Sequence, residues 1–207
     1  VDVSLVELFR RATEVLGRRG IRFAVAGGFA ADIYRAEHRV TQDIDFSIVT
    51  DGPAERLAVA TLEELGLHPA VARRADLAGG PLFAIRRGNT EPCMVVGRPA
   101  GKPGAAGVDL LLPALAWVPE AVRRAQDNLI DFGFGPLPTL TIEDVLLAKF
   151  SALRGAPSRF KDLDDLASIW ETAPELDLEY LAGQMHGLHL VVPKPVADKA
   201  PEVLRRI

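Results

Sequence analysis

Asp43 and Asp45 are separated by a single apolar residue in the run Asp43-Ile44-Asp45-Phe46, which alternates acidic and apolar side chains. Side chains alternate between the faces of a strand, so a strand over residues 43–49 would point both carboxylates the same way. Two carboxylates held that close repel each other unless a cation lies between them. Oxygen ligands of this kind suit Mg²⁺. The alternation therefore predicts a strand that carries a metal site on one face.

A pair of glycines precedes these aspartates at the end of an apolar run. Residues 21–26 are predicted as a buried strand and residues 29–35 as a short helix, with Gly27 and Gly28 turning the chain between them. Backbone N–H groups at the start of a helix bind anions such as phosphate. A phosphate site beside metal-binding carboxylates is typical of enzymes that handle nucleotides, whereas the glycines alone would be compatible with a plain turn.

A third aspartate interrupts another apolar run, Gly107-Val108-Asp109-Leu110-Leu111-Leu112. A carboxylate in a buried strand is costly unless a cation meets it. If the predicted strand 108–112 lies beside the strand 43–49, three carboxylates converge and two metal ions could clamp the attacking and leaving oxygens of a phosphoryl transfer. Asp109 could then accept the proton of the incoming hydroxyl. The alternatives are a solvent-facing pair of aspartates in the first strand and a turn contact for Asp109.

Helical and extended patterns divide the chain into a mixed first half and a helical second half. Predicted helices also cover residues 5–16, 54–65, 119–127, 142–153, 161–171 and 178–186, and further extended segments cover 81–87, 93–96 and 129–134. Gly88 and Asn89 are typical of a hairpin turn and residues 97–107 of a loop. We expect an α+β fold with a mixed β-sheet core flanked by helices. Residues 1–115 would form the catalytic domain and residues 116–207 a mainly helical domain that completes the cleft.

Composition excludes several other classes of protein. The net charge of −4 over 207 residues argues against broad coating of nucleic acid, although a local basic groove is compatible with it. Cys93 is the only cysteine, so no disulfide can form within the chain and a reducing compartment is expected. The sequence has no segment with the apolar length of a membrane span and no secretory signal pattern. We therefore expect a cytoplasmic protein with no membrane partner.

The combined pattern resembles a known superfamily. Gly27-Gly28 followed by Arg39-Val40-Thr41-Gln42-Asp43-Ile44-Asp45 is similar to the signature of the DNA polymerase β-like nucleotidyltransferases. Lys149, Arg154 and the segment Lys161-Asp162-Leu163-Asp164-Asp165 resemble the K…R…KDxxD pattern of the AbiEii-type branch, known mostly as toxins of type IV-like toxin–antitoxin and phage-defence systems. The resemblance extends over residues 21–170.

The resemblance implies an NTP-dependent enzyme that moves a nucleoside monophosphate to an acceptor hydroxyl and releases pyrophosphate. The catalytic residues and ligands of Mg²⁺ or Mn²⁺ would be Asp43, Asp45 and Asp109. The nucleotide would be bound by Gly27, Gly28, Arg39, Thr41, Lys149 and Lys161. Acceptors in this superfamily include RNA 3′ ends, protein side chains and small molecules. AbiEii-type relatives point to tRNA as the acceptor and to an antitoxin protein as a partner.

Simpler roles are open for several of these residues. Arg39 and Thr41 could be a surface charge and a turn residue. Lys149 lies among apolar residues and could extend along them to water. Lys161 and Asp165 have the i,i+4 spacing of a helical ion pair.

One position departs from the superfamily pattern. Many members have Gly-Ser where this chain has Gly27-Gly28, so the serine hydroxyl that would contact the phosphates is absent. Backbone N–H groups would have to bind the phosphates alone.

Two other functions are compatible with the sequence. The first is a catalytically inactive nucleotide- or partner-binding module on the same fold. The second is a glycosyltransferase or phosphatase that uses the Asp-x-Asp pair differently, although the strand–Gly-Gly–helix unit just upstream disfavours it.

Overall fold

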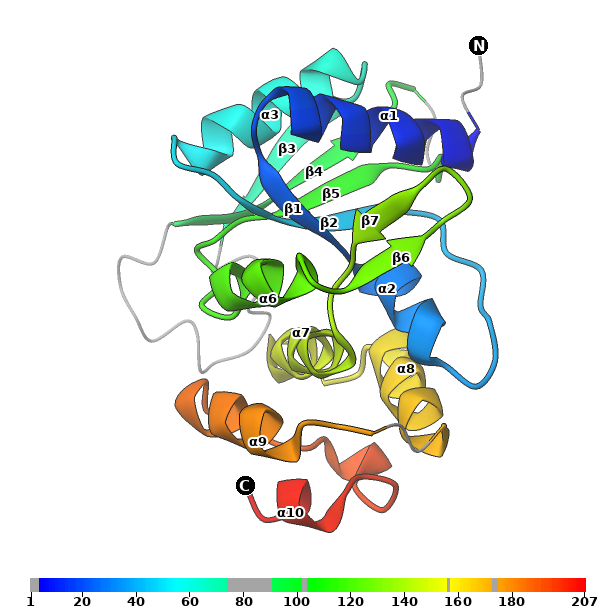
Figure 1. Ribbon diagram of the computed structural model, residues 1–207, viewed down its shortest axis with the longest axis vertical. Helices are drawn as coiled ribbons and strands as arrows, with labels where there is room; N and C mark the ends of the chain where they lie inside the picture. Colours follow the sequence, from blue (N-terminus) through cyan, green and yellow to red (C-terminus); the bar gives the residue numbers. More distant parts are fainter. Residues whose placement is uncertain (1–3, 74–90, 102–103, 156, 173–174) are drawn as a thin grey trace.

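The computed structural model describes residues 4–73, 91–101, 104–155, 157–172 and 175–207, which contain one five-stranded mixed sheet (Figure 1). In pairing order the strands are β1 (Arg22–Ala26), β2 (Ile44–Val49), β5 (Val108–Leu111), β4 (Pro92–Arg98) and β3 (His68–Arg73). The pairing of β2 with β5 is parallel, and the other pairings in this sheet are antiparallel. The expected mixed sheet is confirmed, and β2 and β5 are neighbours in it.

The two strands β2 and β5 are held in place by apolar side chains on one face. Alternate residues of both strands are fully buried there, namely Ile44, Phe46, Ile48, Val108 and Leu110. Because side chains alternate along a strand, Asp45 and Asp109 lie on the opposite face. They are also register partners across the parallel pair. The packing that buries the apolar residues therefore also brings these two carboxylates together.

Helices cover both faces of the sheet (Figure 1). On one face, α1 (Leu5–Arg18) and α3 (Ala54–Glu64) pack on the apolar side of β2 and β5. On the other face lie α2 (Gly27–Tyr34), α6 (Val118–Ala125) and α7 (Ile142–Gly155). The spacing of three or four residues between its apolar side chains explains α1, whose buried residues are Leu8, Phe9, Ala12, Val15 and Leu16.

The C-terminal helices form a further layer against α7. They are α8 (Phe160–Glu171), α9 (Leu178–Gly187), the short 3-10 helix η1 (Lys194–Val196) and α10 (Glu202–Arg205). A two-stranded ribbon of β6 (Leu129–Asp131) and β7 (Pro136–Pro138) leads from α6 into α7. None of the described helices is both long and apolar enough to cross a membrane.

The predicted helices are confirmed, with ends shifted by up to two residues, but the strands needed correction. β3 was not predicted, because His68, Pro69 and Arg73 weaken its apolar pattern. Gly97 and Arg98 extend β4 instead of opening a loop, since Gly97 pairs with Val108. Of the predicted extended segment 129–134, residues 129–131 form β6, which pairs with β7. The predicted strand 81–87 and the turn at Gly88-Asn89 lie outside the described residues.

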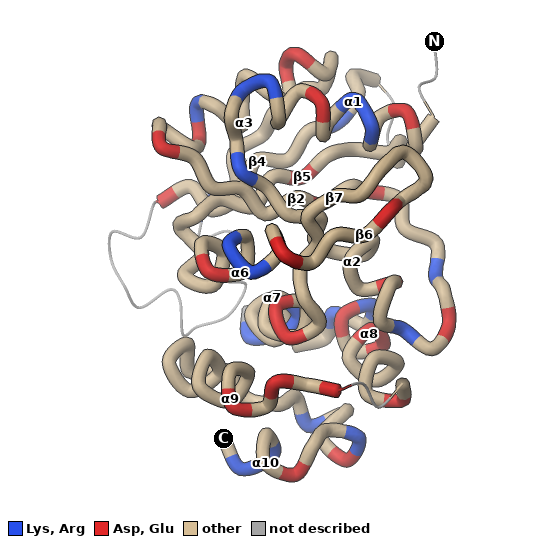
Figure 2. Tube along the Cα trace, in the orientation of Figure 1, with Lys and Arg blue, Asp and Glu red and all other residues tan. Residues whose placement is uncertain are grey.

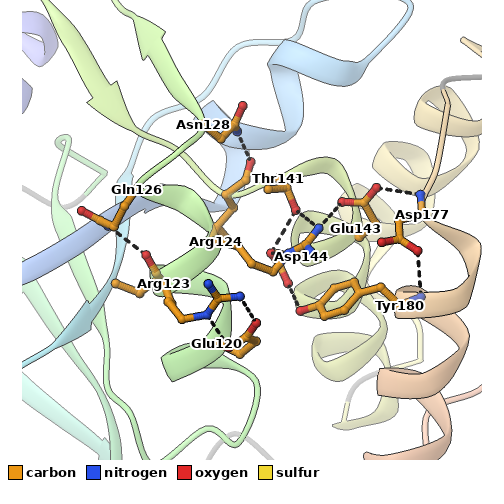
Figure 3. Close-up of polar contacts among 12 residues, drawn as sticks. Glu120, Arg123, Arg124, Gln126, Asn128, Thr141, Glu143, Asp144, Asp177 and Tyr180 are labelled. Carbon is orange, nitrogen blue, oxygen red and sulfur yellow. Dashed lines mark hydrogen bonds and ion pairs between the residues drawn. The ribbon is translucent and has the colours of Figure 1, made fainter.

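A buried polar network ties α6 to α7 and α9 (Figure 3). Arg124 of α6 pairs with Glu143 at 2.9 Å and Asp144 at 3.1 Å, and its guanidinium lies 3.9 Å from the centre of the Tyr180 ring. The Tyr180 hydroxyl donates a 2.7 Å hydrogen bond to Asp144. Both carboxylates are buried, and Arg124 supplies the positive charge that pairs with them inside the protein.

We expect Arg124→Gln to lower the free energy of unfolding by about 2–3 kcal/mol, because two buried carboxylates lose their cation. The neighbouring Arg123→Gln is the matched control, since the exposed Arg123 forms its ion pair with the partly exposed Glu120 on the same helix. Denaturant unfolding of the two variants measures the difference. Equal effects would show that the network does not stabilise the packing of these helices.

Candidate active site

The turn between β1 and α2 places the glycine pair against Asp45. Gly27 has a φ of +59°, a conformation that favours glycine, and a Cβ built there would lie 1.9 Å from Asp45 Oδ2. The backbone N–H of Gly28 donates a hydrogen bond to the Asp45 carboxylate. The helix begins at Gly27 itself, two residues earlier than predicted. Only glycine lets the first turn of α2 come this close to the carboxylate.

The three aspartates singled out in the sequence line one cavity of about 450 Å³. Asp45 and Asp109 face each other across β2 and β5. Asp43 lies just before β2 instead of opening it, and its Oδ1 accepts a 3.2 Å hydrogen bond from the N–H of Gly107, which precedes β5. The start of each of the two parallel strands therefore contributes to the same acidic group.

The carboxylates carry more negative charge than their surroundings balance. The pKa of Asp45 is raised to about 7, first by burial and then by the charges of Asp109 and Asp43, against the opposing effects of Lys149 and the Gly28 N–H. Burial also raises the pKa of Asp109, although hydrogen bonds from Arg98 oppose it. A cation placed among these groups would relieve both effects.

Arg98, at the end of β4, places a positive charge beside these carboxylates. This residue was not identified from the sequence. Its Nη1 donates to Asp109 Oδ1 in a short contact, and its Nη2 lies 3.1 Å from Asp109 Oδ2 and 3.5 Å from Asp43 Oδ2. The residue fell in the predicted loop 97–107. Its role follows only from the antiparallel pairing of β4 with β5, which the local sequence does not reveal.

On the other side of the cavity, Asp165 of α8 gathers three cations. Lys149 Nζ lies 2.7 Å from Asp165 Oδ2, while Arg35 Nη1 and Arg39 Nε lie 2.6 and 2.7 Å from Asp165 Oδ1. Asp165 is fully buried, which alone would raise its pKa, but hydrogen bonds and charges from Arg39 and Lys149 hold the pKa below its usual value. Asp165 pairs with these residues and not with Lys161, so the expected i,i+4 pair is wrong.

Lys149 is a buried cation with two carboxylate partners. Besides Asp165 it donates a 2.8 Å hydrogen bond to Asp162, which also pairs with Arg159 at 2.8 Å. Lys149 therefore does not extend along the apolar surface to water, and its ammonium is fixed at the cavity wall. Asp162 and Asp165, both from the segment Lys161–Asp165, thus fix the position of Lys149, the lysine that the resemblance implies for nucleotide binding.

Thr41 fills the space above Gly28. A Cβ on Gly28 would lie 2.7 Å from Thr41 Oγ1 and 2.8 Å from Thr41 Cγ2, too close for either. The Thr41 hydroxyl is buried and has no hydrogen-bond partner among the described residues. A serine at position 28 would collide with Thr41 in this arrangement, so Gly28 and Thr41 fit each other.

Every nucleotide-site residue expected from the sequence lines the cavity. They are Gly27, Gly28, Arg39, Thr41, Lys149 and Lys161. Two further basic residues, Arg154 and Arg159, line the same cavity. The cavity therefore has an acidic floor at the sheet and a basic wall formed by α7, α8 and the segment before β2. Figure 2 shows that charged residues also gather around α8.

The acidic group fits a divalent cation in its chemistry. Asp43, Asp45 and Asp109 offer hard oxygen ligands, and the charges of Asp109 and Asp43 add to burial in raising the pKa of Asp45. Among the described residues, however, no three side chains of His, Cys, Asp or Glu are already gathered as a metal site. Arg98 pairs with two of the three carboxylates.

Comparison with known proteins gives one family and one fold. A family model described as nucleotidyl transferase AbiEii toxin, type IV TA system, matches residues 13–191. No curated protein matches the sequence.

Several solved structures are similar to the chain. The solution structure of the antibiotic-resistance factor ANT(2'')-Ia has 17% identity and a TM-score of 0.54, covering 91% of this chain and 95% of that one. A crystal structure of ANT(2'')-Ia in complex with adenylyl-2''-tobramycin has 16% identity and a TM-score of 0.54, covering 90% and 99%. An antigenic nucleotidyltransferase-like protein from Paracoccidioides brasiliensis has 16% identity and a TM-score of 0.47, covering 90% and 88%.

At these identities the likeness to ANT(2'')-Ia shows a shared nucleotidyltransferase fold. The family match covers most of the chain and includes the glycine pair, all three aspartates, and Lys149 to Asp165. The chain therefore belongs to the AbiEii nucleotidyltransferase family of type IV toxin–antitoxin systems.

Proposed function

We propose that the protein transfers a nucleoside monophosphate from an NTP to an acceptor hydroxyl and releases pyrophosphate, in a reaction that depends on Mg²⁺ or Mn²⁺. The observation that carries this proposal is the pairing of Asp45 with Asp109 on adjacent strands, directly against Gly27 and Gly28 and across one cavity from Lys149.

The proposed metal ligands are Asp43, Asp45 and Asp109. A divalent ion bound there supplies positive charge next to the oxygens of the reacting phosphate. Asp45 lies between the other two groups and the first turn of α2, so it would fix the metal relative to the bound phosphates. The closeness of the three carboxylates, whose mutual charge adds to burial in raising the pKa of Asp45, supports this assignment.

The triphosphate would lie between the start of α2 and the basic wall. The N–H groups of Gly27 and Gly28 would donate to phosphate oxygens at the positive end of the helix. Lys149 and Arg39, both oriented by Asp165, would neutralise the chain of phosphates, with Lys161 at the rim of the cavity. The hydroxyl of Thr41 lies directly over Gly28, which supports its place in this group.

In the proposed reaction the acceptor oxygen attacks the α-phosphorus, a new O–P bond forms, and the bond to pyrophosphate breaks. Asp109 would take the proton of the acceptor hydroxyl. Burial raises the pKa of Asp109, which makes it a better proton acceptor than an exposed aspartate. The fold of ANT(2'')-Ia, solved with an adenylylated tobramycin, supports nucleotidyl transfer as the chemistry of the site.

Residues 1–115 would supply the carboxylates and the glycine turn, and residues 116–207 would close the cavity with α7 and α8. Membership in the AbiEii family supports a toxin role and an antitoxin partner. We propose tRNA as the acceptor; a protein side chain or a small molecule would carry the label in the test if this part is wrong.

We expect Asp45→Asn to lower nucleotidyl transfer at least about 100-fold, because the group between the metal and the phosphates loses its charge. The assay offers each labelled NTP with Mg²⁺ to tRNA, total protein and small-molecule acceptors. Asp51→Asn is the matched control, since Asp51 is exposed and pairs only loosely with Arg22. Nucleotide binding without transfer by the wild type would instead favour a catalytically inactive module.

The pH dependence of stability tests the same site without activity. The pKa of Asp45 is about 7 in the folded protein and about 3.8 when unfolded, so the folded state holds an extra proton between these values. Without metal, stability should therefore fall as the pH rises from about 4 to about 7, by about 3–4 kcal/mol. Asp45→Asn should make this slope clearly smaller in pH-dependent thermal unfolding, with the remainder due to Asp109 and Asp144, whose pKa values are also raised. Added Mg²⁺ should restore the stability of the wild type at pH 8. A slope as large in the variant as in the wild type would contradict the assignment.

Asp165→Asn should weaken ATP binding at least about tenfold and lower the free energy of unfolding by about 3 kcal/mol, because three cations lose their shared carboxylate. The adjacent Asp164→Asn is the control, since Asp164 is half-exposed and forms an ion pair with Arg35. Calorimetric titration with ATP and denaturant unfolding measure the two effects. Similar results for both variants would remove Asp165 from its proposed role.

A further inference from the structure

Arg98 occupies the position among the carboxylates that a cation would be expected to take. Its guanidinium bridges Asp109 and Asp43. Both Nη1 and Nη2 contact Asp109, and Nη2 lies 3.5 Å from Asp43 Oδ2. Bidentate arginine–carboxylate contacts are among the stronger and more directional ion pairs. The side chain belongs to β4, whereas its partners belong to β5 and to the segment before β2.

The backbone provides a dedicated place for this side chain. Gly107 lies directly beneath it, and a Cβ on Gly107 would lie 2.4 Å from Arg98 Nη1 and 2.8 Å from Arg98 Cδ. The same Nη1 donates a 3.0 Å hydrogen bond to the carbonyl oxygen of Gly97. The N–H of Gly107 in turn binds Asp43. Arg98 is therefore held by three groups, Asp109, Asp43 and the Gly97 carbonyl, and the absence of a side chain at position 107 makes room for it.

We propose that Arg98 is an internal counter-cation that competes with the divalent ion for Asp109 and Asp43, so that metal binding has to move its guanidinium off these carboxylates. This inference rests on the proposed function, because it takes the three aspartates as metal ligands. Arg98 then keeps the ligand-free site from carrying three neighbouring negative charges, and it sets the metal affinity lower than the carboxylates alone would give.

The geometry distinguishes this role from simple positioning of Asp109. An arginine that only positioned a ligand would be expected to contact one oxygen and leave the other to the metal. Arg98 instead engages both oxygens of Asp109 and reaches the second carboxylate as well. Its positive charge also lies within contact distance of two proposed ligands, where it must repel a divalent ion.

The test is the affinity of the purified protein for Mn²⁺ alone, measured by electron paramagnetic resonance at pH 8 without nucleotide. Arg98→Gln should bind Mn²⁺ at least about tenfold more tightly than the wild type, because a neighbouring positive charge is gone. Arg98→Lys keeps the charge and should stay within about threefold of the wild type. Arg22→Gln, which removes an exposed arginine from β1, should not change the affinity.

Unchanged or weaker Mn²⁺ binding by Arg98→Gln would overturn the competition, while leaving the proposed metal site intact if the wild type binds Mn²⁺ and Asp45→Asn does not. Absence of Mn²⁺ binding by both the wild type and Arg98→Gln would overturn the competition together with the metal-dependent function. Circular dichroism and thermal unfolding confirm that each variant is folded. The shift in melting temperature on adding Mn²⁺ should be larger for Arg98→Gln than for the wild type, and an equal shift would also count against the competition.

Discussion

The mutual repulsion of three carboxylates at the start of β2 and β5 is the constraint on which the rest of the site depends. Parallel pairing of these strands puts Asp45 and Asp109 side by side, and Asp43 is added by its hydrogen bond to Gly107. No ordinary core would tolerate this arrangement without opposing charge. The neighbouring structure supplies that charge from two directions, through Arg98 on the sheet and through Lys149 on α7.

The C-terminal helices contribute to the site through their ion pairs as well as their apolar packing. Asp165 connects α8 to α7 through Lys149 and to the segment after α2 through Arg35 and Arg39. Any movement of α8 would therefore change the position of the cations on the basic wall of the cavity. The network around Arg124 fixes α6, α7 and α9 to one another in a similar way, farther from the cavity (Figure 3).

Sequence reasoning found the parts of the site that depend on local spacing. The aspartate pair and the glycine turn can be recognised because strand alternation and turn chemistry act within a few residues, whereas the lysine on α7 was indicated only by the resemblance to the AbiEii-type branch. Arg98 and the partners of Asp165 could not be found this way, since they depend on which strands and helices become neighbours. β3 was missed for a different reason: a proline and charged ends hide a strand whose place is decided by its pairing with β4.

The exclusion between positions 28 and 41 has a consequence for recognising related proteins. A hydroxyl close to the start of α2 can come from residue 28 or from residue 41, but the space between them holds only one such side chain. Across homologous chains the two positions should consequently vary together, with serine at the first accompanied by a smaller residue at the second. A search pattern that demands serine after the first glycine would pass over enzymes built like this one.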